Sequence, residues 1–266
     1  MGVLWANFVA IYRRELQSYF ASPLSFGIAG VYWFLSGLFY ILILGRIVNA
    51  VAQQDSQGQL GITLPAVDVP AVILENYLGV LGTLSLFILP FLSMGLFAQE
   101  RQQGTLELLA TSPVTTTMVA LGKLAAVVTF FFTLTLPPLI YELATLLTSQ
   151  PPFSWGVILM GHAGLILLAA AILALGLFLS ALTESNLLAA ISTFGLMLVL
   201  WILQAIADPI QGPAGQVLRH LSLLQHFSQL AKGLLSLSSV VLFLSYILLG
   251  LFLTVQYVDG LRFQRV

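Results

Sequence analysis

The sequence contains very few charged residues and no cysteine. Of its 266 residues, 7% are Asp, Glu, Lys or Arg, whereas soluble proteins average about 25%. The mean hydropathy is +1.02, and 59% of the residues are hydrophobic. So few charges could not cover the surface of a soluble fold, and we therefore expect lipid to solvate the chain. The absence of cysteine excludes disulfides, thiolate metal sites and cysteine nucleophiles.

Several classes of binding and catalytic motif are also missing. A net charge of −1 and a pI near 6.3 offer no basic surface for nucleic acid. Gly122-Lys123 lacks the glycine five residues earlier that a phosphate-binding loop requires. The sequence also contains no H-E-x-x-H and no G-x-S-x-G. We therefore expect no catalytic residue, cofactor site or metal site on this chain.

The positions of the charges divide the chain into six apolar segments. Each is long enough to cross about 30 Å of hydrocarbon as a helix, and none alternates apolar and polar residues as a membrane β-strand would. The sequence therefore predicts an all-α integral membrane protein with one domain over residues 1–266. We expect its six spans at about residues 24–45, 73–98, 119–147, 155–182, 186–207 and 236–257.

Basic residues are distributed unequally between the two ends of these spans. The end that carries both termini and the loop after the second span has six Lys or Arg residues, and the other end has three. The positive-inside rule therefore predicts that both termini lie in the cytoplasm. The outer segments 46–72 and 207–232 are expected to be modest connections, the second with a re-entrant or interfacial helix around LRHLSLLQHF.

The N-terminal segment is apolar on one side. Helical spacing over about residues 3–21 places Trp5, Phe8, Tyr12 and Tyr19 on one broad face, and the segment ends at Ser22-Pro23. This pattern predicts an amphipathic helix in the membrane interface. The alternative is an N-terminal extension of the first span.

The loop between the second and third spans contains a short helical pattern. Gln102-Gln103-Gly104 forms a polar break, Thr105 is suited to cap a helix, and Glu107 complements the helix dipole. A short helix then includes Leu106, Leu108 and Leu109, and Ser112-Pro113 begins the next helix. Such a helix either docks a soluble partner or packs its leucines against the membrane.

The residues of this loop resemble those of ABC-2 type permeases, the membrane subunits of type-2 ATP-binding-cassette transporters. The resemblance is carried by the string Glu100-Arg101-x-x-Gly104-Thr105-Leu106-Glu107-Leu108-Leu109-x-Thr111-Ser112-Pro113-Val114, followed by Gly122-Lys123. YRRELQSYFASP is similar to the family's interfacial connecting helix. The segment around Leu221, His226 and Lys232 most resembles the branch of the gliding-motility permease.

The resemblance implies a function and a set of partners. The chain would be half of a dimeric permease in a bacterial inner membrane, and two copies of a cytoplasmic ATPase would bind ATP and Mg. Residues 105–112 would form the coupling helix that docks on the ATPase. Glu100 and Arg101 would connect it to the interfacial helix at Arg13, Arg14 and Glu15. An accessory membrane protein with an extracytoplasmic domain is a further possible partner.

Two other functions remain open. The chain could be a membrane anchor that transmits force to an outer partner. It could also be an intramembrane enzyme, for which Glu142 and His162 could form a pair near the outer ends of their spans. However, Glu142 is near enough to the boundary to reach water. His220 and His226 could bind a metal together, or could simply lie in a solvated loop.

Overall fold

The computed structural model describes residues 2–59, 68–106, 114–149, 153–207, 210 and 212–263. Every regular element within these ranges is a helix, which confirms the all-α prediction. In chain order the helices are α1 (Gly2–Ala21), α2 (Pro23–Gln59), α3 (Val69–Ser93), α4 (Gly95–Gln102), α6 (Thr116–Leu146), α7 (Trp155–Leu182), α8 (Asn186–Ala207), α9 (Pro213–Leu221), α10 (Leu223–Ala231) and α11 (Leu237–Phe263).

Five helical segments are long and apolar enough to cross a membrane. They are Pro23–Gln57, Val69–Gln102, Thr116–Leu146, Trp155–Leu182 and Leu237–Leu261. These segments are typical of a multi-pass membrane protein. The predicted fifth span is present as α8, but its apolar stretch, Asn186–Ile202, is shorter than those five. A sixth crossing therefore stays a prediction.

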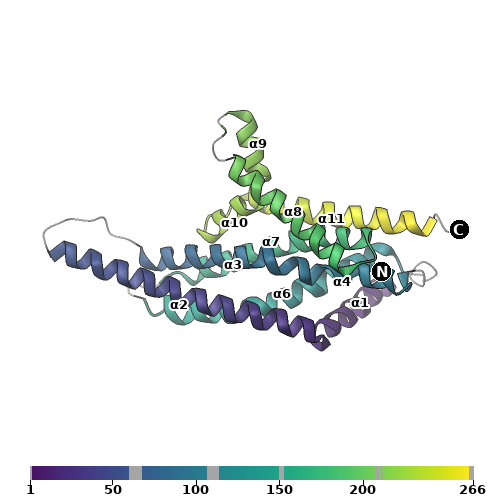
Figure 1. Cartoon of the computed structure of the whole chain (residues 1–266), viewed down its shortest axis with the longest axis horizontal. Coiled ribbons are helices and arrows are strands. Elements are labelled where there is room, and N and C mark those ends of the chain that lie inside the picture. Colours follow the sequence, from purple (N-terminus) through teal and green to yellow (C-terminus); the bar gives the residue numbers. More distant parts are fainter. Residues whose placement is uncertain are drawn as a thin grey trace.

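Helix α7 forms the centre of the molecule and contacts α3, α4, α6, α8, α10 and α11 (Figure 1). Small residues on α7 allow its neighbours to approach closely. A Cβ atom at Gly176 would lie 2.4 Å from Ser93 Oγ of α3. On the other side, a Cβ atom at Gly250 of α11 would lie 2.5 Å from the backbone of Ala174. The close packing of these helices therefore requires glycine at both positions.

Helix α1 is separate from α2 and lies against α6, so it is not an extension of the first span (Figure 1). The two helices meet at Ser22, which is not helical. Tyr19 stacks on Phe130 of α6 with ring centroids 5.2 Å apart, and its hydroxyl donates to Leu92 O at 2.7 Å. Aromatic contacts therefore fix the inward face of α1.

Helix α2 is much longer than the span predicted at 24–45. Its 37 residues correspond to about 55 Å at 1.5 Å per residue, and its far end projects beyond α3 (Figure 1). The outer segment 46–72, which was predicted to be a modest connection, begins as a continuation of this helix as far as Gln59. Charged residues mark where placing the chain in hydrocarbon becomes unfavourable. They do not mark the end of a helix, because a polar sequence without proline can remain helical in water.

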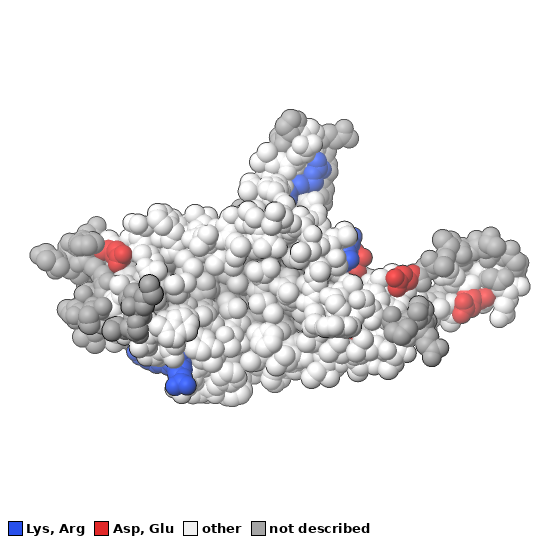
Figure 2. All heavy atoms as spheres, turned by 180° about the vertical axis from the view of Figure 1, so that it is seen from behind, with Lys and Arg blue, Asp and Glu red and all other residues white. Residues whose placement is uncertain are grey.

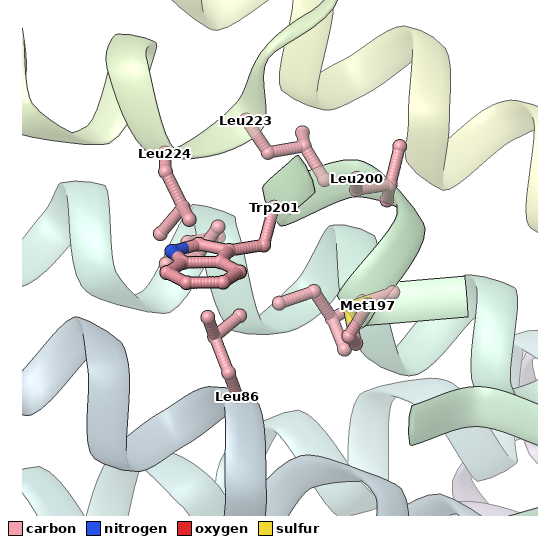
Figure 3. A pocket seen from close by; sticks show the side chains of 8 residues that line it. Leu86, Met197, Leu200, Trp201, Leu223 and Leu224 are labelled. Atoms are coloured by element: carbon pink, nitrogen blue, oxygen red, sulfur yellow. The ribbon is translucent and has the colours of Figure 1, made fainter. Parts of the chain in front are cut away.

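The end of α8 and α9 rise from the bundle, whereas α10 lies back against α7 and α3 (Figure 1). The expected helix around residues 218–227 is present as two helices, which are divided at Ser222; its hydroxyl accepts from Gln225 N and so caps α10. Helix α8 packs on the bundle through apolar side chains around Trp201. Figure 3 shows the Trp201 indole between Leu86 of α3 and Leu224 of α10, in a pocket of apolar side chains.

Charged side chains are concentrated away from the middle of the bundle. On the face seen in Figure 2, the described surface of the central part is almost free of Asp, Glu, Lys and Arg. Coloured residues lie towards the two ends and on the projecting helices. Both chain termini lie at the same end of the molecule (Figure 1), which is hereafter called the terminal end.

Candidate coupling site at the terminal end

Three helices meet at a buried lysine at the terminal end. Lys123 of α6 is 3% exposed, and its Nζ lies 2.9 Å from Glu15 Oε1 of α1 and 2.9 Å from Glu100 Oε1 of α4. The same Nζ lies 5.4 Å from the centroid of the Phe97 ring. A buried charge is tolerated only when it is paired. Lys123 therefore connects α1, α4 and α6 through one ion-pair cluster.

Gly122 allows α1 to lie close enough for this cluster to form. A Cβ atom at Gly122 would lie 2.9 Å from Ile11 Cγ2 and 3.4 Å from the backbone nitrogen of Tyr12. The Tyr12 hydroxyl also donates to Thr129 Oγ1 at 3.2 Å, about two turns further along α6. Gly122 thus allows α1 to approach α6 closely, and Lys123 binds α1 through Glu15.

Arg101 of α4 connects a second set of helices. Its Nη1 donates to Ala181 O of α7 at 2.8 Å and to the Tyr257 hydroxyl of α11 at 3.1 Å. Its Nη2 lies 3.1 Å from Glu184 Oε1, and the arginine side chain is 17% exposed. The planar guanidinium can satisfy several acceptors at once, which an ammonium group does less well.

The two neighbouring charges therefore have different partners. The prediction that Glu100 contacts the interfacial helix is consistent with the cluster, because both Glu100 and Glu15 bind Lys123. The same prediction for Arg101 was wrong, because its contacts are with α7, α11 and Glu184. Arg13 and Arg14 lie on the exposed side of α1. Side chains four residues apart share a helix face, whereas adjacent ones do not.

A break in the second predicted span positions Glu100 and Arg101. Helix α3 ends at Ser93 and α4 begins at Gly95. The Ser180 hydroxyl of α7 donates to Met94 O at 2.8 Å and accepts from the backbone N–H groups of Phe97 and Ala98, both at 3.0 Å. One side chain thus satisfies three backbone groups at the break.

A glycine turn ends α4 before the predicted coupling helix. Gly104 has φ +68°, and the N–H of Thr105 donates to Glu100 O at 3.0 Å. This is the left-handed C-terminal turn that glycine favours. The Thr105 hydroxyl also donates back to Glu100 O at 3.3 Å. The polar break predicted at residues 102–104 is therefore present as a helix-ending turn.

The greater part of the predicted coupling helix lies outside the described residues. These undescribed positions include Glu107, Leu108, Leu109, Ser112 and Pro113. Leu106 is described, is partly buried and packs against the core. Its assigned role, with that of the rest of the loop, stays a prediction.

Several residues of this site were not singled out from the sequence. They are Tyr257, whose hydroxyl accepts from Arg101, and Thr116 and Asp259, whose side chains form a 2.5 Å hydrogen bond. Their partners are 143 to 156 residues away in the sequence. The only available signal was that these polar groups border apolar spans, which does not identify a partner.

The structure supports neither alternative for His226, whereas His220 is exposed. His226 lies on α10, where its Nδ1 is 2.8 Å from Ser239 Oγ and its Nε2 is 3.0 Å from His220 O. Burial lowers the pKa of His226 below its ordinary value. Both ring nitrogens are thus engaged by the protein, so His226 has no free ligand atom, and it is not in a solvated loop. Among the described residues, no three acidic or histidine side chains are grouped as a metal site.

Comparison with protein-family models gives no match for this chain. Comparison with curated proteins gives none either. The features of this chain that indicate a function are therefore the loop signature and the contacts around it.

Proposed function

We propose that this chain is the membrane permease subunit of an ABC-2 type transporter. It would provide half of a dimeric path, and ATP would be hydrolysed on a separate ATPase subunit present in two copies. The orientation would place both termini and the loop after α4 in the cytoplasm of a bacterial cell, with α8 as the sixth span. Export is the expected direction of transport.

One relationship supports this proposal best. The signature begins with Glu100 and Arg101, and these residues join α4 to α1, α6, α7 and α11. The loop that follows is therefore mechanically connected to most of the bundle. A force applied to residues 105–112 by an ATPase would reach α1 through Lys123 and α7 through Arg101. A loop helix that served only to cover the membrane surface would not need these connections.

The contribution of the loop leucines can be tested by detaching the ATPase. A helix of about two turns is marginal by itself, so a partner must hold it. Each leucine buried on docking would contribute about 1–3 kcal/mol. The double variant Leu108→Asp/Leu109→Asp should therefore lose copurification with the ATPase while the chain still inserts. Glu107→Lys should weaken binding less, because an exposed ion pair contributes at most about 1 kcal/mol.

The matched control is Gln102→Asp/Gln103→Asp, which adds the same charge at exposed positions of the neighbouring turn. This control should retain the ATPase. Normal copurification and normal ATP hydrolysis in the leucine double variant would contradict the coupling-helix assignment. Equal loss in both double variants would show that added charge, and not loss of the leucines, is responsible.

A membrane anchor is the second candidate function. It is favoured by the part of α2 beyond residue 45, which projects from the bundle, and by the projecting α9 (Figure 1). Both lie at positions where an outer partner could bind. Removal of residues 47–57, which make up about three helical turns, would abolish an anchoring function. The same deletion would leave ATPase binding at the terminal end unchanged.

A further inference from the structure

A buried acid and a buried base face one another far from the coupling site. Glu142 of α6 is 0% exposed and His162 of α7 is 5% exposed at its side chain, and Glu142 Oε2 lies 3.5 Å from His162 Nδ1. The expectation that Glu142 reaches the aqueous boundary was wrong. Both residues are part of the packed interior, and an ionisable group at such a position requires an explanation.

The surroundings of the pair contain no compensating charge. Among the described residues, His162 is the one basic side chain that forms an ion pair with Glu142. The other titratable groups that face it are phenols: Tyr32 and Tyr40 of α2, Tyr77 of α3 and the neighbouring Tyr141 of α6. Phenols are uncharged below about pH 10. The net charge of this interior is therefore set by Glu142 and His162 together.

The hydrogen bonding of the pair is incomplete. His162 Nδ1 lies 3.2 Å from Ile158 O, so this nitrogen carries a proton and donates it. Within the described part of the chain, neither carboxylate oxygen of Glu142 has a hydrogen-bond partner, and neither has His162 Nε2. Buried polar atoms without partners are costly and are uncommon away from functional sites. Simple structural stabilisation therefore explains this pair poorly.

Close packing keeps the pair away from solvent. A Cβ atom at Gly161, next to His162, would lie 2.3 Å from Leu78 Cδ1. Glycine at this position therefore lets α3 close over the histidine. Tyr77 of α3 is 0% exposed and contacts Tyr40 with ring centroids 4.7 Å apart. Helices α2, α3, α6 and α7 thus enclose the acid and the base.

We propose that Glu142 and His162 form a site that binds one proton. With no proton the pair would leave one negative charge in an apolar interior, and with two it would leave one positive charge. With one proton the pair is neutral, either as carboxylic acid and imidazole or as carboxylate and imidazolium. Only the one-proton state avoids an uncompensated buried charge. The folded protein therefore keeps this proton over a wide pH range, whether or not the chain acts as a permease.

The proton makes stability depend on pH in a defined way. In the unfolded chain, glutamate loses its proton near pH 4.3 and histidine near pH 6.5. Above about pH 7 the folded pair holds one proton and the unfolded pair holds none, so stability falls as pH rises. The unfolding constant should then increase about tenfold per pH unit. Between about pH 5 and 6 both states hold one proton, and the pair contributes no slope.

Two single variants separate the contributions of Glu142 and His162. Each is compared with Glu142→Gln/His162→Gln, in which neither position titrates, by unfolding in mixed micelles from pH 4.5 to 8.5. In Glu142→Gln, stability should no longer fall as pH rises above 7. It should instead fall as pH drops below about 6, because the histidine then gains a proton in the unfolded chain while the buried histidine of the folded protein stays uncharged. In His162→Gln, stability should begin to fall with rising pH above about pH 5, because the unfolded glutamate loses its proton there while the buried Glu142 keeps its own. Glu75→Gln, at an ion pair with Lys232 that is about half exposed, is the control and should follow the unsubstituted protein.

A second measurement uses the unsubstituted protein and does not depend on the variants folding. At pH 8, exposed glutamates are ionised and exposed histidines are neutral. Infrared spectra with ¹³C-labelled glutamate and ¹⁵N spectra of histidine should therefore reveal one protonated glutamic acid or one imidazolium. The absence of both would overturn the proposal. Parallel pH profiles for all the variants would overturn it as well.

Discussion

Lys123 Nζ and Glu15 Oε1 lie 2.9 Å apart although the two residues are 108 positions apart in the chain. The same lysine binds Glu100, so the N-terminal helix and the end of the second apolar segment share one cation. Two carboxylates compete for this charge, and both are mostly buried. The arrangement makes the position of α1 depend on Lys123.

Replacing Lys123 by methionine should strongly destabilise the protein. The change would leave two neighbouring carboxylates without their cation, and breaking such a buried pair costs about 3 kcal/mol or more. The melting temperature in detergent should fall accordingly, and α1 should become accessible to protease.

The triple variant Lys123→Met/Glu15→Gln/Glu100→Gln provides the test of this reason. It removes all three charges and should recover most of the lost stability, because replacement of a whole buried ion pair is often neutral. An unchanged melting temperature for Lys123→Met alone would contradict the importance of the cluster.

Gly122→Ala should displace α1 from α6. The new Cβ atom would lie 2.9 Å from Cγ2 and 3.1 Å from Cβ of the branched Ile11 side chain, which leaves no space for it. Overpacking of this kind costs about 1–3 kcal/mol. Gly45→Ala of α2 is the matched control, since a Cβ atom there meets nothing within 4 Å. Comparison of the two melting temperatures measures the effect, and a smaller loss for Gly122→Ala than for Gly45→Ala would refute it.

Arg101→Lys should destabilise the protein despite conserving the charge. A lysine cannot reach Ala181 O, the Tyr257 hydroxyl and Glu184 in one geometry, so at least one hydrogen bond is lost at a cost of about 1–2 kcal/mol. Glu184→Gln should cost at most about 1 kcal/mol, because Glu184 is 65% exposed. If chemical unfolding instead found Glu184→Gln to be the more harmful change, the ion pair would matter more than the contacts with α7 and α11.

Single cysteines can determine the orientation of the chain. Gln103→Cys lies in the turn after α4 and Gln57→Cys lies near the far end of α2, and both positions are exposed. The natural sequence has no cysteine, so each label is unique. In intact cells an impermeant maleimide should label Gln57→Cys alone, and Gln103→Cys only after the membrane is opened. Labelling of both in intact cells would disprove the predicted topology.

The positions of helices were predictable where an apolar segment was bounded by proline or by several polar residues. Residues 155–182 and 186–207 were expected to be helices, and α7 and α8 have these bounds. Proline and a polar break mark the start of α7, and Thr183 to Ser185 separate it from α8. The end of α2 was not predictable in this way, because a polar helix and a polar loop of similar composition both tolerate water. The division of the second span at Met94 follows Pro90 by four residues, but the hydroxyl that satisfies its backbone groups belongs to Ser180, 86 residues away from Met94.

The sequence by itself determined that the chain is helical and apolar enough to be solvated by lipid. These properties follow from composition and periodicity, which act locally along the chain. Only the tertiary structure decided which charges pair. Glu100 and Arg101 are adjacent, yet they bind different helices, and Glu142 is enclosed with His162 where a position near the boundary was expected. Pairing depends on which helix faces meet, and glycines such as Gly122 and Gly161 set that distance through contacts with residues far away in the sequence.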